Sequence, residues 1–235
     1  MRPRLEGAAV RGVALWLAAA TAFAQSGGSA TRYPEMAAAE QYRMPRAEEM
    51  QLARSAAPPS ISDSAEIWVL DRDGYTQVAK GSNGFSCLVE RGWSAGLEDP
   101  DFWNPRLRAP ICFNAAAARY LVPLLNLRTR AVFETRSKDE LAKRVRDAQA
   151  KGELPALGEG AMCFMMSKSG YLSDQGGHWH PHLMFFEPRT GPAAWGSNLT
   201  GSPVLGFTDA LDGVTTFLVP VQHWSDGTAV TAAAH

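Results

Sequence analysis

The sequence predicts an α+β domain with an antiparallel sheet of about six strands, helices inserted between the third and fourth strands, and a helical N-terminal extension. Two observations support this expectation. Three strand-like segments come first, two helical segments follow, and three more strand-like segments complete the chain, which is the order of an α+β domain. The 235 residues, 46% of them hydrophobic, are enough for one domain with a substantial core.

The first 24 residues have the features of an export signal. Three arginines within residues 1–11 precede an apolar run at residues 13–22, and Ala22-Phe23-Ala24 forms a cleavage site of the A-x-A type. The apolar run is shorter than the roughly 20 residues that cross a bilayer. We therefore expect a periplasmic or secreted mature protein that keeps no stable membrane anchor.

A helical extension follows the signal. Residues 25–59 begin with a Gly- and Ser-rich lead-in. Residues 34–55 are rich in Ala, Glu, Met and Arg, with Pro45 at the first-turn position of a second helical segment. Residues 60–228 are expected to form the single main domain, and residues 229–235 a disordered tail.

The first three strands are short and separated by turns. Residues 66–70 (EIWVL) and 75–80 flank a turn that contains Asp73-Gly74, which predicts a hairpin. A second, Gly-rich turn leads into the third strand at residues 85–90. Neighbouring strands are expected to run antiparallel.

Two helices are marked by their capping residues. Asn114 is a good N-cap for residues 115–127, although Pro123 is expected to kink or split that helix. The motif Ser-Lys-Asp-Glu that starts at Ser137 is a capping box, and it opens a helix that Gly152 closes. The aromatic- and proline-rich stretch before these helices is expected to be a loop.

Strands return at residues 161–168, 179–187 and 215–221. With the two helices between the third and fourth strands, this order resembles that of PAS-like sensor domains. The resemblance implies an antiparallel sheet that can hold an apolar small ligand, and it assigns no activity by itself.

Three cysteines lie in a chain that is expected to be exported, where disulfides form. They allow three pairings, of which we favour Cys87–Cys112 because these residues flank a loop-rich segment. Closing that loop would stabilise the fold by roughly 3 kcal/mol. Cys163 would then remain as a buried thiol or a metal ligand.

The most distinctive segment is GGHWHPHLMF at residues 176–185, which holds three of the five histidines. His178, His180 and His182 alternate along the chain, so in a strand their imidazoles project from one face. Neutral imidazole is the commonest protein ligand of zinc, copper and iron. The segment therefore predicts a site for a divalent transition metal, with copper or zinc favoured.

The strand at residues 161–168 is expected to pair antiparallel with the histidine strand and to extend this site. Two registers are open. If Met165 faces His182, the face shared with the histidines also carries Cys163 and Met184, and sulfur beside imidazole favours copper. A slip by one residue would present other side chains of the partner strand, namely Met162, Phe164 and Met166.

The run His180-Pro181-His182, followed after four residues by Glu187, resembles the H-x-H-x(3,4)-E metal motif of cupins, and His223 resembles the later histidine of their second motif. The resemblance implies that these three histidines and the glutamate hold a metal in a barrel, often for oxidative or isomerising chemistry. The glycine spacing around the run departs from the cupin pattern, and the two predicted helices are foreign to a small barrel.

Function stays open between three hypotheses: a metal-binding module, a cupin-like metal-dependent enzyme, and a PAS-like domain that binds an apolar small ligand. The phrases KGSNGF, DFWNP, PICFN and GGHWHPHLMFF, spread over residues 53–228, resemble a group of uncharacterised secreted bacterial proteins. That resemblance implies export from a Gram-negative cell and supplies no activity. The net charge of −1 argues against a nucleic-acid partner.

Overall fold

A computed structural model of the protein describes residues 32–174 and 180–231. The expected signal peptide, the predicted ligand His178 and the last four residues of the expected tail lie outside the described residues. The described residues belong to one compact unit. Within them, no helix is long and apolar enough to cross a membrane.

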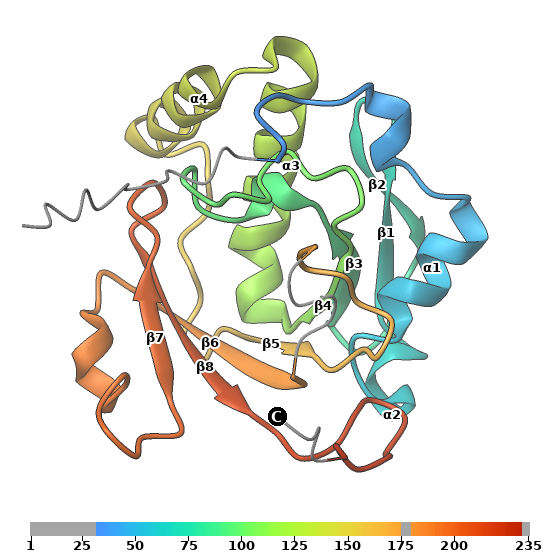
Figure 1. The fold of residues 1–235 in the computed structure, drawn as a ribbon, viewed down its shortest axis with the longest axis vertical. Helices are drawn as coiled ribbons and strands as arrows, with labels where there is room; N and C mark the ends of the chain where they lie inside the picture. The colour runs from blue at the N-terminus through green and yellow to red at the C-terminus, as the bar shows by residue number, and fades with distance from the viewer. Residues whose placement is uncertain (1–31, 175–179, 232–235) are drawn as a thin grey trace, which may run out of the picture. The chain divides into compact units, whose positions relative to one another are not determined.

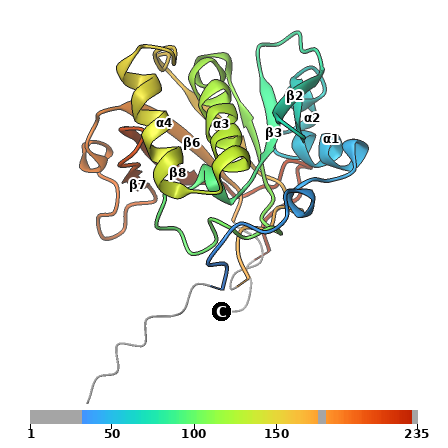
Figure 2. The ribbon, with the colours of Figure 1, turned by 90° about the horizontal axis from the view of Figure 1, so that it is seen from above.

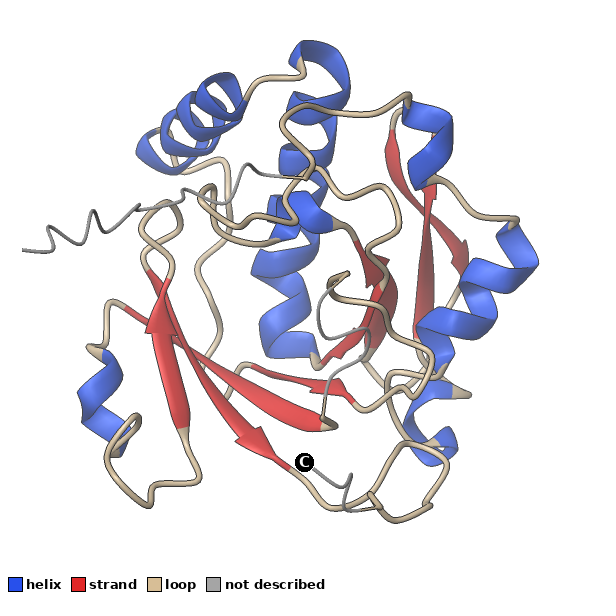
Figure 3. Ribbon diagram, in the orientation of Figure 1, coloured by secondary structure: helices blue, strands red, loops and turns tan. Residues whose placement is uncertain are grey.

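The described residues form one mixed sheet of eight strands (Figure 1, Figure 3). The strands follow the order β2-β1-β3-β4-β5-β6-β8-β7 across the sheet. The α+β class fits, but the predicted antiparallel sheet of six strands is wrong, because β1 and β3 run parallel and the sheet contains two unpredicted strands, β4 and β7. The strands are β1 (Glu66–Asp71), β2 (Gly74–Ala79), β3 (Ser86–Glu90), β4 (Ala109–Phe113), β5 (Met162–Met165), β6 (His182–Pro188), β7 (Leu205–Thr208) and β8 (Val214–Pro220).

The parallel pair results from the segment after β2, which crosses the start of β1 instead of reversing beside β2. Ser82 N donates to Ser64 O at 2.8 Å, and Glu66 N donates to Phe85 O at 2.8 Å. Gly81 passes so close to β1 that a Cβ there would lie 2.4 Å from Glu66 N. Because β3 enters from the end where β1 also begins, the two strands run in the same direction.

Strand β4 lies in the stretch that was expected to be a loop, and all five of its residues are buried. Pro110 pairs with Val89 of β3 inside this strand. The ladder between β4 and β5 contains only the pairs Cys112–Phe164 and Phe113–Cys163. Pro110 has no N–H to donate, but it lies outside the two residue pairs that join β4 to β5. A central strand can therefore contain this proline.

Helix α3 (Ala115–Thr135) continues through Pro123, so the expected split at Pro123 and the expected end near residue 127 are wrong. Pro123 lies on the exposed side of α3, where water can bond the carbonyl that the proline leaves without a donor. The predicted N-caps are confirmed: Asn114 accepts from Ala117 N, and Ser137 accepts from Glu140 N at the start of α4 (Lys138–Ala150).

The sheet curves around α3, and α4 lies beside α3 (Figure 1, Figure 2). The face toward α3 is called the concave face below, and it carries the larger hydrophobic core. Helix α1 (Arg46–Arg54) packs on the opposite, outer face against β1, β3 and β4, followed by the short α2 (Pro59–Ser62). Three short 3-10 helices complete the elements of residues 32–174 and 180–231: η1 (Ala39–Tyr42), η2 (Gly92–Ser94) and η3 (Pro192–Trp195).

The predicted disulfide is confirmed, because Cys87 and Cys112 are bonded across neighbouring strands β3 and β4. Both residues are fully buried in the core of the outer face, beneath α1. A buried disulfide suggests that the protein folds in an oxidising compartment.

Residues 32–59 pack against the sheet within the same compact unit. Tyr42 is fully buried, and its hydroxyl donates to Trp103 O at 2.8 Å. Glu49 of α1 forms an ion pair with Arg91 at 2.9 Å, with both side chains fully buried. The extension is therefore tied into the core at two points.

Candidate metal centre

The strand that contains His182 pairs with the strand that contains Cys163, as the sequence predicts. β5 and β6 are antiparallel, with Cys163 opposite Met184 and Met165 opposite His182. Of the two registers left open by the sequence, the structure has the one that places Met165 opposite His182. Directly opposed residues, and residues two apart on one strand, share a face of the sheet. Cys163, Met165, His182 and Met184 therefore form one group of four, here called the sulfur–imidazole patch.

The patch lies on the concave face. Cys163, Met165 and His182 are buried, with exposed fractions of 0%, 5% and 6%, whereas Met184 is half-buried. Its sulfur-bearing members pack with the core residues beneath α3. The donors are thus shielded from water on one side, and Met184 is the member that solvent can reach.

A backbone hydrogen bond orients the imidazole of His182. Its Nδ1 lies 2.7 Å from the carbonyl oxygen of His180. Because a carbonyl can only accept, Nδ1 carries the proton and the lone pair of the neutral ring is on Nε2. Fixing the tautomer through Nδ1 and a backbone carbonyl is typical of histidines that bind metals through Nε2. Burial also lowers the pKa of His182, which favours the neutral ring.

Glu90 is a titratable residue of the concave face that the sequence analysis missed. It follows Leu88 by two positions on β3, and Leu88 belongs to the core of the concave face, so the side chain of Glu90 is on that face as well. Burial raises the pKa of Glu90 to about 7, and the charge of Arg128 opposes that rise. Burial, reinforced by the charge of Glu90, raises the pKa of the Cys163 thiol well above its usual value. The alternation in residues 85–90 places Glu90 on the same side as Leu88, but only the strand order shows that this side belongs to the concave face.

The remaining predicted ligands lie elsewhere. His180 is exposed in the segment before β6, and His223 is exposed beyond β8. Glu187 is five positions from His182 on the uninterrupted strand β6, so alternation places it on the outer face. The cupin-like set requires Glu187 and His182 on one face, and the structure places them on opposite faces. His178 lies outside the described residues.

Within residues 32–174 and 180–231, no three His, Cys, Asp or Glu side chains are close enough together to hold a metal ion. A metal site in this part of the chain therefore depends on methionine sulfur as well. Cys163 and His182 supply two conventional ligands of the patch, and Met165 and Met184 supply two thioethers. This donor set matches soft ions and suits hard ions such as Mg²⁺ or Ca²⁺ poorly.

Comparison of the chain with known protein families, with curated proteins and with solved structures gives no match. The resemblance to secreted bacterial proteins and the local similarity to the cupin motif therefore stay predictions.

Proposed function

We propose that the protein is a copper-binding module of the periplasm or of the secreted fraction, and that copper binds at the sulfur–imidazole patch. The register between β5 and β6 is the observation that carries this proposal, because it gathers one thiol, two thioethers and one imidazole on a single face. A disulfide elsewhere in the fold agrees with a compartment outside the cytoplasm.

The two thioethers favour copper over zinc. Protein zinc sites use Cys, His, Asp and Glu, whereas thioether sulfur selects for Cu(I). A patch in which Met165 and Met184 provide half of the donors would leave zinc with only Cys163 and His182. Zinc is therefore the weaker alternative at this site.

Four donors around one ion favour a binding module over an enzyme. A catalytic metal site keeps a coordination position open for water or substrate. The patch can fill the coordination of Cu(I) with protein ligands alone, which is the arrangement expected for holding or transferring an ion.

Titration with Cu(I) in the presence of a competing chromophoric chelator tests the proposal. We expect Met165→Leu, Met184→Leu and His182→Gln each to lower the affinity for Cu(I) by at least about tenfold, because each removes one metal ligand. Leucine has nearly the volume of methionine, so the two methionine-to-leucine variants disturb packing little. X-ray absorption of the copper-loaded protein should show copper–sulfur scattering.

Glu187→Gln on the outer face and the exposed His223→Ala are the matched controls, and neither should change the affinity for Cu(I). Unchanged affinity in all three patch variants, with circular dichroism like that of the wild type, would overturn the proposal. Loss of binding in His182→Gln and in both control variants, with unchanged affinity in Met165→Leu and Met184→Leu, would favour the cupin-like ligand set. Tighter binding of Zn²⁺ than of Cu(I) would contradict the preference for copper.

A further inference from the structure

The exposed large hydrophobic side chains of residues 32–174 and 180–231 all lie at one edge of the sheet, on β7 and on the segment that precedes it. The exposed fraction of each of these residues is between 42% and 66%. Residues 190–208 contain no charged side chain, although Arg189 and Asp209 flank them directly. The four exposed residues, here called the apolar edge, are Trp195, Leu199, Leu205 and Phe207.

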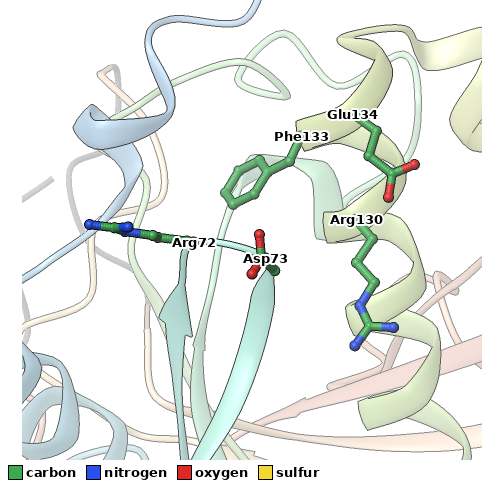
Figure 4. Close-up of a pocket in the computed structure, with 5 residues that line it drawn as sticks. All are labelled: Arg72, Asp73, Arg130, Phe133 and Glu134. Carbon is green, nitrogen blue, oxygen red and sulfur yellow. The ribbon is translucent and has the colours of Figure 1, made fainter.

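The β1–β2 turn, at the other end of the sheet, is charged instead. A hollow between this turn and α3 is lined mainly by the charged side chains of Arg72, Asp73, Arg130 and Glu134 (Figure 4). The guanidinium of Arg72 points away from Arg130, so these charges do not converge on one ligand. Charged side chains of this kind are typical of a surface that stays in water. The apolar edge differs from this surface, because a group of exposed apolar side chains marks a site of contact with a protein or a membrane.

The segment that carries the apolar edge is fixed to the sheet. η3 lies beside β7 (Figure 1), and Trp195 of η3 stacks on the fully buried Phe217 of β8, with ring centroids 4.3 Å apart. The segment also comes so close to β7 that a Cβ at Gly206 would lie 2.2 Å from Ser197 Oγ, an approach that only glycine allows. The exposed apolar surface is therefore a fixed feature of the fold.

The side chains of the apolar edge lie on both sides of the sheet. Through the ladders of β8, Leu205 and Phe207 share the concave face with Met184. Trp195 lies on the outer face, where it stacks on Phe217. A rigid partner with a flat surface would contact only one of these sides. The fluid boundary between the headgroups and the acyl chains of a membrane can contact both sides of an inserted edge.

Several polar backbone groups of this edge already have partners within the protein. The side chain of Asn198 donates to Gly206 O at 2.7 Å and accepts from Gly206 N at 3.1 Å. The backbone N of Asn198 donates to Val204 O at 3.0 Å, and Val204 N donates to Ser202 Oγ at 3.2 Å. Backbone groups without partners oppose entry into an apolar phase, and so do charged side chains. These bonds and the lack of charge in residues 190–208 therefore lower the free-energy cost of moving the edge out of water.

We propose that the apolar edge binds the surface of a lipid membrane, with its four side chains at the boundary between headgroups and acyl chains. Tryptophan is enriched at this boundary, where its ring meets both apolar and polar groups. The net charge of −1 gives the protein no general attraction to anionic lipids, so the binding is apolar and zwitterionic lipid is sufficient for it. The association is reversible, and it does not rest on the proposed copper site.

Cosedimentation with phosphatidylcholine vesicles tests the proposal. The processed protein, which lacks residues 1–24, is used because the apolar run at residues 13–22 would itself bind lipid. We expect Leu199→Ser and Phe207→Thr each to lower the partition coefficient by about three- to tenfold, because at least half of each residue is still accessible for burial. Salt at about 0.5 M should not weaken binding of the wild type, since no ion pair contributes to it. Both variants should keep the circular dichroism of the wild type.

Val78→Thr on β2, the strand at the opposite edge of the sheet, is the matched control and should bind vesicles like the wild type. The proposal is overturned if the wild type does not bind phosphatidylcholine at about 5 mM lipid. It is also overturned if binding requires anionic phosphatidylglycerol and disappears at high salt, or if Val78→Thr weakens binding as much as the two edge variants. Sedimentation velocity without lipid covers the remaining outcome. A wild-type dimer that Leu199→Ser and Phe207→Thr dissociate would show that a second copy of the chain covers the apolar edge, and it would overturn the proposal as well.

Discussion

At the scale of single residues, Asp212 shows what burial of a charge costs in this fold. It lies in the turn between β7 and β8, with Oδ2 3.5 Å from Nη1 of Arg128. Arg128 also donates to the carbonyl oxygens of Trp93 and Ala95, so its donors are shared. Oδ1 of Asp212 is buried and has no hydrogen-bond partner in the described part of the chain. Burial, only partly offset by Arg128, raises the pKa of Asp212 to about 6.

The raised pKa makes the contribution of Asp212 to stability depend on pH. A carboxyl with a raised pKa in the folded state contributes stability that is fully present below its unfolded pKa of about 3.9 and is lost as the pH rises through about 6. We expect Asp212→Asn to match the wild type near pH 4 and to be more stable at pH 7 by about 2–3 kcal/mol, the equivalent of two pKa units.

Urea unfolding at pH 4, 5.5 and 7 measures this difference. Asp63→Asn, at an exposed carboxyl, is the control and should show little change between these pH values. A constant difference between Asp212→Asn and the wild type across the series would show that folding does not raise the pKa of Asp212, and it would contradict this prediction.

At the scale of elements, the edge strand β7 depends on one asparagine for protection. Asn198 Nδ2 donates to Gly206 O at 2.7 Å, and Asn198 Oδ1 accepts from Gly206 N at 3.1 Å. The backbone N of Asn198 also donates to Val204 O at 3.0 Å. Residues 190–208 contain no charged side chain, and Leu205 and Phe207 on β7 are half exposed. No charged side chain of this segment therefore keeps another strand from pairing with β7. The side-chain amide of Asn198 instead bonds the N–H and C=O of Gly206, which another strand would otherwise use.

We expect Asn198→Gly to increase self-association, because it opens the edge of β7 without straining the backbone. Asn198 has a φ of +60°, which glycine adopts freely. Sedimentation velocity at protein concentrations from about 5 to 200 μM would show the mean mass of the variant rising with concentration above that of the wild type. Thr200→Ala, exposed in the same loop, is the control. Equal sedimentation of Asn198→Gly and the wild type would mean that the amide does not protect the edge.

Local signals in the sequence predicted some elements well, and non-local contacts explain the rest. The capping residues Asn114 and Ser137 predicted two helix starts, because capping depends on neighbours in the chain. The parallel pairing of β3 could not be predicted, since it depends on how closely Gly81 passes β1. β4 was not predicted because a proline argues against a central strand, and the sequence does not show that the ladder between β4 and β5 is too short to include Pro110.

The candidate site shows the same division. Alternation predicted which residues of β6 share a face with His182. The sequence also offered Glu187 as a possible ligand beside His182, whereas the uninterrupted strand β6 places Glu187 on the outer face. The register with β5 was one of two possibilities, because a slip by one residue gives an equally apolar partner face. Glu90 was missed because the sequence does not show that β3 and β5 flank β4 and line the same concave face.

At the scale of the whole molecule, the sheet is covered on both faces at β1, β3 and β4, and the N-terminal segment supplies the outer cover there. Helix α1 shields the apolar residues of β1, β3 and β4 on the outer face, including the disulfide. Glu49 neutralises Arg91, whose side chain is fully buried. Removal of this segment would expose the outer core and leave a buried charge without its partner, which alone costs about 3–5 kcal/mol.

A variant that begins at residue 60 should therefore fail to fold, because this loss is comparable with the total stability of about 5–15 kcal/mol that a typical domain has. A variant that begins at residue 32 retains α1, Tyr42 and the Glu49–Arg91 pair, and we expect it to unfold cooperatively near the wild-type Tm. Circular dichroism and the dispersion of amide NMR signals distinguish the two. Glu49→Ala in the full chain separates the effect of the charge from that of lost coverage, and it should lower the free energy of unfolding by about 3–5 kcal/mol. A cooperative transition in the variant that begins at residue 60 would show that the sheet is stable with one covered face.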